Sequence, residues 1–239
     1  MPWLEEHKEN ARNLMRENAP KIFIISIIFI VIVTLMSELQ FGLLGTGNVF
    51  DQYIQHLAAG ELPNLGTLYS YLRPNGMPPA FVLWLLSPVI YTGYKSYCLI
   101  ITRGQPGEHK NIFDGFLVPG KIMLIQIITS IFVMLWSLLF FFPGLVAYYR
   151  YRQAYYILLD DPTKGALQCI RESKHMMRRN KLDLFLLDLS FVGWSLLNIF
   201  LIGLMPLPFA LPIVSILLTP YHGLTCAAFY NRLISSFTV

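Results

Sequence analysis

The stretch Ile22–Met36, IFIISIIFIVIVTLM, decides the class of this protein. It lies within an apolar segment, residues 22–44, whose first charged residue is Glu38. The hydrocarbon core of a bilayer is about 30 Å thick and is crossed by about 20 mostly apolar helical residues. The segment is therefore long enough to cross a membrane. No short apolar region followed by a small-residue cleavage site is present, which argues against a removable signal peptide.

The composition of the whole chain points the same way. Of the 239 residues, 55% are hydrophobic and 13% are charged, and the net charge is +4. The charged share is about half of the roughly 25% typical of soluble globular proteins. Such a chain does not stay disordered, and its three cysteines are too few for a secreted disulfide scaffold. The low net charge also argues against nucleic-acid binding. We predict an all-α, polytopic membrane bundle that forms a single domain over residues 1–239.

We predict six membrane spans, with both termini in the cytoplasm. The fourth, LVAYYRYRQAYYILL, is short and carries Arg150 and Arg152, so hydropathy alone would omit it. The positive-inside rule favours its inclusion, because only then do all the larger basic segments face the cytoplasm. A re-entrant or interfacial segment is the alternative. Pro143-Gly144 is expected to form the tight reversal before it. The predicted spans are residues 22–44, 80–102, 121–142, 145–159, 182–205 and 207–230.

Amphipathic helices are predicted outside the spans. In the N-terminal arm, residues 1–20, apolar residues recur at three- and four-residue spacing, which is typical of a helix on a membrane surface. On the cytoplasmic side, Asp161-Pro162 predicts the start of a helix that ends near Asn180. Its basic residues are expected to contact anionic lipid headgroups. Its apolar face is predicted to consist of Ala166, Cys169, Ile170 and Met177. A short outer helix is expected over residues 49–59. The proposed headgroup contacts are Arg171, Lys174, Arg178, Arg179 and Lys181.

Charged residues inside the spans are the strongest indication of a functional site, because a charge in a span needs a partner or water. Lys95 and Asp188 are expected at similar depth, about 9–10 Å from the cytoplasmic side, and to form an ion pair or share a polar cavity. Alternatively, Lys95 reaches the membrane surface and Asp188 takes a hydroxyl partner. Arg150 is expected to reach the outer surface. Arg152 is expected to face the interior with Tyr156.

Two interpretations of the arginines remain open at this point. In the first, Arg152 and Tyr156 form a binding site for an anion or a lipid headgroup, which Tyr221 and His222 could join. In the second, the arginines belong to a buried network that holds the hairpin in place.

No motif for an enzyme or a metal site is present. The histidines are scattered without an HExxH pattern, and Cys98, Cys169 and Cys226 lack CxxC spacing. The cysteines are expected to be small packing residues. A GxSxG nucleophile turn is also missing. We therefore expect no catalysis, no metal and no cofactor.

Several sequence motifs resemble one family in both content and order. They are KENARNLM (8–15), GYKSYCLIITRG (93–104), IFDGF (112–116), PGLVAYYRYRQAYYILLDDP (143–162), GALQCIRESKHMMRRNK (165–181), FVGW (191–194) and PYHGLTCAAFY (220–230). The chain resembles the bacterial integral membrane family catalogued as domain of unknown function 975. It also resembles membrane domains found beside glycerophosphodiester phosphodiesterases. Arg179 departs from the pattern, since such families often have Gly there. The resemblance implies a six-span protein of the bacterial cytoplasmic membrane and implies no known activity.

Two functions fit these observations. The first is a non-enzymatic membrane protein with a polar intramembrane site, either transport- or channel-like or binding lipids or anions. Its expected partners are anionic membrane lipids and further copies of the chain. The second is an accessory or scaffold protein that acts on envelope lipids, peptides or a larger membrane complex. The expected site residues are Lys95, Arg150, Arg152, Tyr156 and Asp188.

Overall fold

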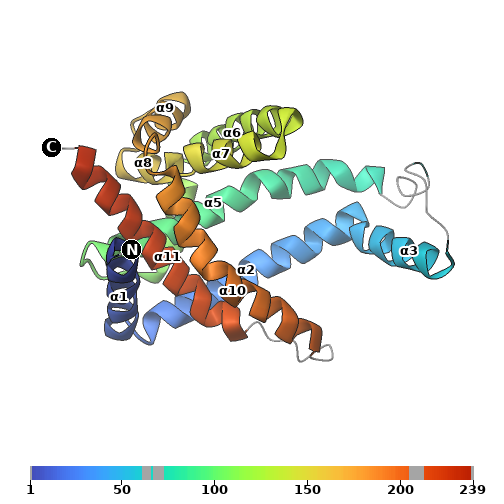
Figure 1. Ribbon diagram of the computed structural model, residues 1–239, viewed down its shortest axis with the longest axis horizontal. Coiled ribbons are helices and arrows are strands. Elements are labelled where there is room, and N and C mark those ends of the chain that lie inside the picture. Colours follow the sequence, from blue (N-terminus) through green and yellow to red (C-terminus); the bar gives the residue numbers. More distant parts are fainter. Residues whose placement is uncertain (1, 61–65, 67–72, 205–212, 238–239) are drawn as a thin grey trace. The chain divides into compact units, whose positions relative to one another are not determined.

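The computed structural model describes residues 2–60, 66, 73–204 and 213–237, and within these residues it is helical without strands (Figure 1). The all-α prediction is thus confirmed. The chain forms two compact units, Val31–Pro88 and the remainder. The elements are α1 (Pro2–Glu17), α2 (Lys21–Leu44), α3 (Thr46–Ala58), η1 (Pro74–Gly76), α5 (Met77–Thr102), η2 (His109–Leu117), α6 (Pro119–Leu139), α7 (Phe141–Tyr151), α8 (Ala154–Asp160), α9 (Ala166–Met176), α10 (Lys181–Leu204) and α11 (Ile213–Phe237).

Within the described residues, every predicted span is largely helical, but the number of crossings stays a prediction. Within the described part of the chain, two helices, α2 and α6, are long and apolar enough to cross a membrane. They are consistent with a membrane protein. The start of the last predicted span, residues 207–212, lies outside the described residues. So does most of the segment 61–72, which lies between the first and second predicted spans.

The unit Val31–Pro88 is organised around the end of α2. Gly45 adopts the left-handed conformation, with φ 69°, and separates α2 from α3. The N–H of Arg73 donates to the carbonyl of Leu44 at 3.0 Å. Gly76 lies so close to α2 that a Cβ there would be 1.8 Å from the Leu43 carbonyl oxygen. Glycine therefore permits the 3-10 turn to pack directly on the helix end. The helix predicted over 49–59 is present as α3.

The N-terminal helix α1 packs on α11 (Figure 1). Ala11, on its predicted apolar face, is buried. The Trp3 ring lies 6.1 Å from that of Phe229, and the guanidinium of Arg232 lies 4.8 Å from the Trp3 ring. The predicted helix is thus confirmed, and its apolar face covers another helix of the protein.

The segment η2 packs against α5 through glycines of two motifs, GYKSYCLIITRG and IFDGF. A Cβ at Gly93 would lie 1.7 Å from the Ile112 carbonyl oxygen, which no side chain could tolerate. The hydroxyl of Ser96 donates to Asp114 Oδ2 at 2.6 Å. The motifs GYKSYCLIITRG and IFDGF therefore form one contact, in which the aspartate fastens the loop to the helix.

The helices α6 and α7 form a tight antiparallel hairpin (Figure 1). The reversal occurs at Phe140, whose backbone is extended, and the prediction that Pro143-Gly144 would form it is wrong. Proline suits the first turn of a helix, where its missing N–H is not needed, and Pro143 is the third residue of α7. Gly144 instead faces Ser137, because a Cβ there would be 1.9 Å from the serine Oγ.

The return segment of the hairpin is broken. The predicted single helix over 145–159 is replaced by α7 and α8, which are separated by a turn at Arg152 and Gln153. The hydroxyl of Tyr155 donates to Gln126 Oε1 at 2.7 Å. Lys121 Nζ, near the start of α6, donates to the Pro162 carbonyl at 2.5 Å. The chain thus returns along α6 to the level at which α6 began.

The basic helix α9 is shorter than predicted. It begins at Ala166 and ends at Met176, whereas Asp161-Pro162 forms a turn. The carboxylate of Asp161 accepts a hydrogen bond from the Thr163 N–H at 3.1 Å, so it stabilises that turn and does not cap a helix. The predicted apolar face is correct, since its four members are buried. They are Ala166, Cys169, Ile170 and Met177.

Candidate functional site

Asp188 on α10 is the centre of a polar cluster between three helices. Its Oδ2 forms an ion pair with Arg152 and accepts a hydrogen bond from the hydroxyl of Tyr149 at 3.0 Å. Its Oδ1 lies 3.0 Å from His222 Nε2. The side chains of Arg152 and Asp188 are only 16% and 20% exposed. The pair is therefore largely removed from solvent, where an unpaired charge would be costly.

Cys226 completes this arrangement. Its Sγ lies 3.5 Å from His222 Nε2 and 3.6 Å from Arg152 Nη2. His222 and Cys226 are four residues apart on α11, so they occupy the same face of the helix. We call Tyr149, Arg152, Asp188, His222 and Cys226 the Asp188 cluster.

The break between α7 and α8 positions Arg152. This residue caps the C-terminal end of α7, and its guanidinium lies about 6 Å from the rings of Tyr148 and Tyr149 (6.0 and 5.9 Å). The prediction that Arg152 faces the protein interior agrees with this geometry. Its aromatic neighbours belong to α7, and Tyr156, which was expected to face the interior with it, is buried and stacks on Tyr230.

Lys95 does not form the expected ion pair with Asp188 in the described structure. Its ammonium lies 4.5 Å from the ring centre of Tyr155 and 5.4 Å from that of Tyr156. Tyr156 is 3% exposed and stacks on Tyr230. The reason for the different pairing is that Asp188 already accepts from Arg152, which the helix break directs toward α10. A shared polar cavity for Lys95 and Asp188 stays a prediction.

Arg150 lies apart from the Asp188 cluster. Its guanidinium lies 5.9 Å from the Tyr151 ring, and its carbonyl accepts a hydrogen bond from Ser173 Oγ at 2.9 Å. Ser173 belongs to α9, the basic helix. The expected reach of Arg150 to the outer surface is therefore unsupported, because this bond holds its backbone beside a helix assigned to the cytoplasmic side.

Three members of the Asp188 cluster were not predicted as main site residues from the sequence. Tyr149 and Cys226 were not expected there, and His222 was expected only as an additional member. The four-residue spacing of His222 and Cys226 was the available signal. It was inconclusive because their partners come from α7 and α10, which lie far away in the sequence.

Asp188, His222 and Cys226 are also the residues that could hold a metal ion. One ligand atom from each lies within 4.8 Å of the others. However, Arg152 already occupies the carboxylate and approaches the sulfur. A divalent cation there would place two further positive charges beside a guanidinium, so the charge balance of the cluster disfavours a metal.

A second polar network joins the ends of three helices. Arg103, which follows α5, makes two parallel hydrogen bonds to Asp160, at 2.7 and 2.9 Å. Tyr230 also donates to Asp160, and Arg103 Nε donates to Asn231. The hydrogen bond with Asp160 raises the pKa of Arg103, which stays charged. This network fastens α5, α8 and α11 together.

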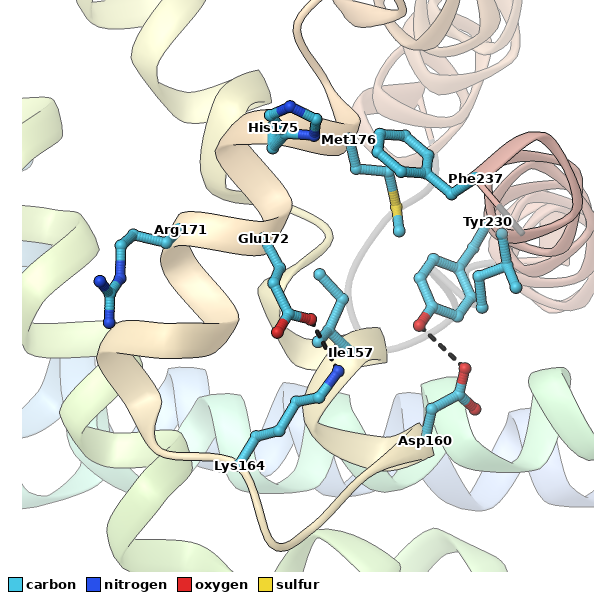
Figure 2. Close-up of a pocket in the computed structure, with 10 residues that line it drawn as sticks. Ile157, Asp160, Lys164, Arg171, Glu172, His175, Met176, Tyr230 and Phe237 are labelled. Carbon is cyan, nitrogen blue, oxygen red and sulfur yellow. Dashed lines mark hydrogen bonds and ion pairs between the residues drawn. The ribbon is translucent and has the colours of Figure 1, made fainter. Parts of the chain in front are cut away.

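A cavity of about 490 Å³ lies beside this network, between α8, α9 and α11 (Figure 2). Its wall includes the ion pair of Lys164 with Glu172, at 2.7 Å, and the hydrogen bond of Tyr230 with Asp160. Arg171 also lines it, although its side chain points away from the other labelled residues (Figure 2). The other predicted headgroup contacts on or after α9, Lys174, Arg178, Arg179 and Lys181, are exposed or partly exposed, and their role stays a prediction.

Comparison with known proteins supports the family resemblance. No curated protein and no solved structure matches the chain. One family model does match, over the part that contains every member of the Asp188 cluster. Residues 143–236 match the model of the family described as "Protein of unknown function (DUF975)", the family that the sequence motifs resemble.

Proposed function

We propose that this protein is a non-enzymatic integral protein of the bacterial cytoplasmic membrane, with an interior polar site that binds an anionic group. The group would be a phosphate or carboxylate, carried by a lipid headgroup or by a transported solute. The observation that carries the proposal is an imbalance of charge. Lys95 and Arg152 lie inside the helical assembly, with His222 as a third basic group. Asp188 is the carboxylate that contacts Arg152 and His222, whereas Lys95 lies over the ring of Tyr155.

The exposed apolar surface supports the membrane part of the proposal. Large apolar side chains that a water-soluble protein would bury are exposed along several helices. Met134, Leu138 and Phe142 are 73%, 83% and 76% exposed. Leu189 and Trp194 on α10 are 50% and 56% exposed. Acyl chains would cover such a surface without cost.

The path of the chain supports a common side for the two termini. Because α7 and α8 lead back along α6 to the level of Lys121, the two ends of this hairpin lie on one side of any membrane that α6 enters. With α2, α5, α10 and α11 as crossing helices, both termini then lie on one side, which the positive-inside rule assigns to the cytoplasm.

The surroundings of Lys95 support the anion. Its described contacts are the rings of Tyr155 and Tyr156, and such a contact contributes about 0.5–2 kcal/mol. An isolated buried ammonium costs several kcal/mol. An anion beside Lys95 would compensate the charge that the rings leave uncompensated. The 35% exposure of His222 indicates that the cluster is open on the side of α11.

Transport and lipid binding share this chemistry, and an experiment separates them. The purified protein would be titrated with inorganic phosphate, with phosphatidylglycerol and with phosphatidylcholine while its melting temperature is measured. Stabilisation by phosphate indicates a solute site, and stabilisation by phosphatidylglycerol alone indicates a headgroup site.

Variants of Lys95 make this experiment decisive. We expect Lys95→Gln to fold and to lose the stabilisation, and Lys95→Arg to keep it. Lys110→Gln is the matched control, since that lysine pairs with Glu108 and is 76% exposed. Equal stabilisation of wild type and Lys95→Gln would refute the site. No stabilisation by any anion would favour the accessory or scaffold function.

A further inference from the structure

The end of the α6–α7 hairpin is an uninterrupted apolar surface. We call residues 129–148 the apolar hairpin. The sequence has no charged residue between Lys121 and Arg150. The side chains of Phe140 and Phe141, at the turn, are 71% and 74% exposed. Toward its base the hairpin is covered by other helices, because α9 packs on α6 and α7, and α10 packs on α7.

The base of the apolar hairpin lies at the level of a strongly basic helix. Ser173 Oγ on α9 donates to the carbonyl of Arg150 at 2.9 Å, two residues after the end of the apolar hairpin. Arg171 and Lys174, on either side of Ser173, are exposed. Exposed basic side chains need water or headgroups and are costly within hydrocarbon. The bond therefore places Arg150 close to the membrane surface on which α9 lies.

The length of the hairpin above Arg150 fits half a bilayer. From Phe141 to Arg150 there are nine helical steps, or about 14 Å at 1.5 Å per residue. Half of the hydrocarbon core is about 15 Å. A hairpin that starts near one surface at Arg150 thus ends near the bilayer centre. It would need about twice this length to expose its turn on the opposite side.

The turn itself suits an environment without water. The N–H of Phe140 donates to the Trp136 carbonyl at 3.2 Å, and that of Gly144 donates to the Phe140 carbonyl at 3.5 Å. The backbone donors at these positions are thus satisfied within the hairpin, as hydrocarbon requires. The hydroxyl-bearing side chain of Ser137 faces Gly144 across the hairpin.

We propose that the apolar hairpin enters the bilayer from the side on which α9 lies and turns within it, with lipid acyl chains as its partner. This inference rests on the membrane part of the proposed function. It selects the re-entrant alternative for residues 145–159, so that four helices cross and both termini stay on one side. The Asp188 cluster, whose Arg152 follows Arg150 by two residues, then lies near the α9 surface, within reach of headgroups from that leaflet.

Depth measurements with spin labels test the proposal. Phe141→Cys places a label at the turn, and Lys174→Cys places one on α9. The native cysteines are buried, so the wild-type protein gives the labelling background. In vesicles of phosphatidylglycerol and phosphatidylcholine, we expect the label at position 141 to meet oxygen and to be protected from a water-soluble nickel chelate. The label at position 174 should show the reverse. Phe142→Cys provides a second turn position if Phe141→Cys does not fold.

Labelling with a membrane-impermeant maleimide separates the alternatives. We expect the turn cysteine to be unreactive from both sides of the membrane and position 174 to react from one side. Reaction of the turn from the side opposite position 174 would show a full crossing and overturn the proposal, while leaving the anion site intact. Reaction from the same side would overturn both the hairpin and its membrane environment. Strong spin–spin broadening between turn labels would show that a second copy covers the surface, and would also overturn the proposal.

Discussion

Removing Asp188 should destabilise the protein more than removing its partner Arg152. Asp188→Ala leaves a guanidinium that is 16% exposed without its carboxylate, and it removes the acceptor of the Tyr149 hydroxyl. Breaking a buried ion pair from one side costs about 3–5 kcal/mol. Arg152→Met leaves Asp188 with Tyr149 and His222, so the expected cost is that of a charged hydrogen bond, about 1.5–3 kcal/mol.

The double variant should reveal the coupling between the two side chains. When both charges are absent, neither is left uncompensated, so the cost should be smaller than the sum of the single costs by more than the cost of Arg152→Met alone, which is about 1.5–3 kcal/mol. It should also be smaller than that of Asp188→Ala alone. The free energy of unfolding would be measured by titrating sodium dodecyl sulfate into mixed micelles and following tryptophan fluorescence.

An exposed ion pair in the same protein provides the matched control. Glu108 and Lys110 are 59% and 76% exposed and lie 2.8 Å apart. The same cycle there should give a coupling of about 0–1 kcal/mol. The reasoning fails if the effects of the Asp188 and Arg152 substitutions simply add, or if Arg152→Met is the more damaging one.

Three further outcomes follow from the contacts described above. Gly93→Ala should cost about 1–3 kcal/mol, because its Cβ would meet a carbonyl oxygen, whereas Gly120→Ala, with open space, should be tolerated; unfolding titrations compare the two. Burial raises the pKa of the Cys169 thiol, so its thiolate fraction is smaller at every pH than that of a free thiol. Between about pH 7 and pH 9, alkylation of Cys169 should therefore be slower than that of a free thiol, and unfolding the protein should remove the difference. Arg103→Lys should lose the paired hydrogen bonds to Asp160 and cost about 0.5–1 kcal/mol, and an unchanged melting temperature would contradict this.

The sequence by itself determined the helices and their apolar faces. Membrane-length apolar runs such as residues 22–44 depend on local composition, and the buried face of α9 follows from the 3.6-residue period of the helix. These features need no knowledge of distant partners. The interior orientation of Arg152 followed from the same reasoning, because a guanidinium cannot remain in hydrocarbon without acceptors.

Only the tertiary structure decided which charges meet. Similar depth made Lys95 and Asp188 plausible partners, but depth along the membrane does not specify which helices are neighbours. The turn after Tyr151 directs Arg152 toward α10, and the packing of α10 on α11 brings His222 to the same carboxylate. Lys95 is left facing the rings of α8. An ion pair depends on a few ångströms in three dimensions, and that distance is set by helix packing and by one broken helix, neither of which is encoded in local periodicity.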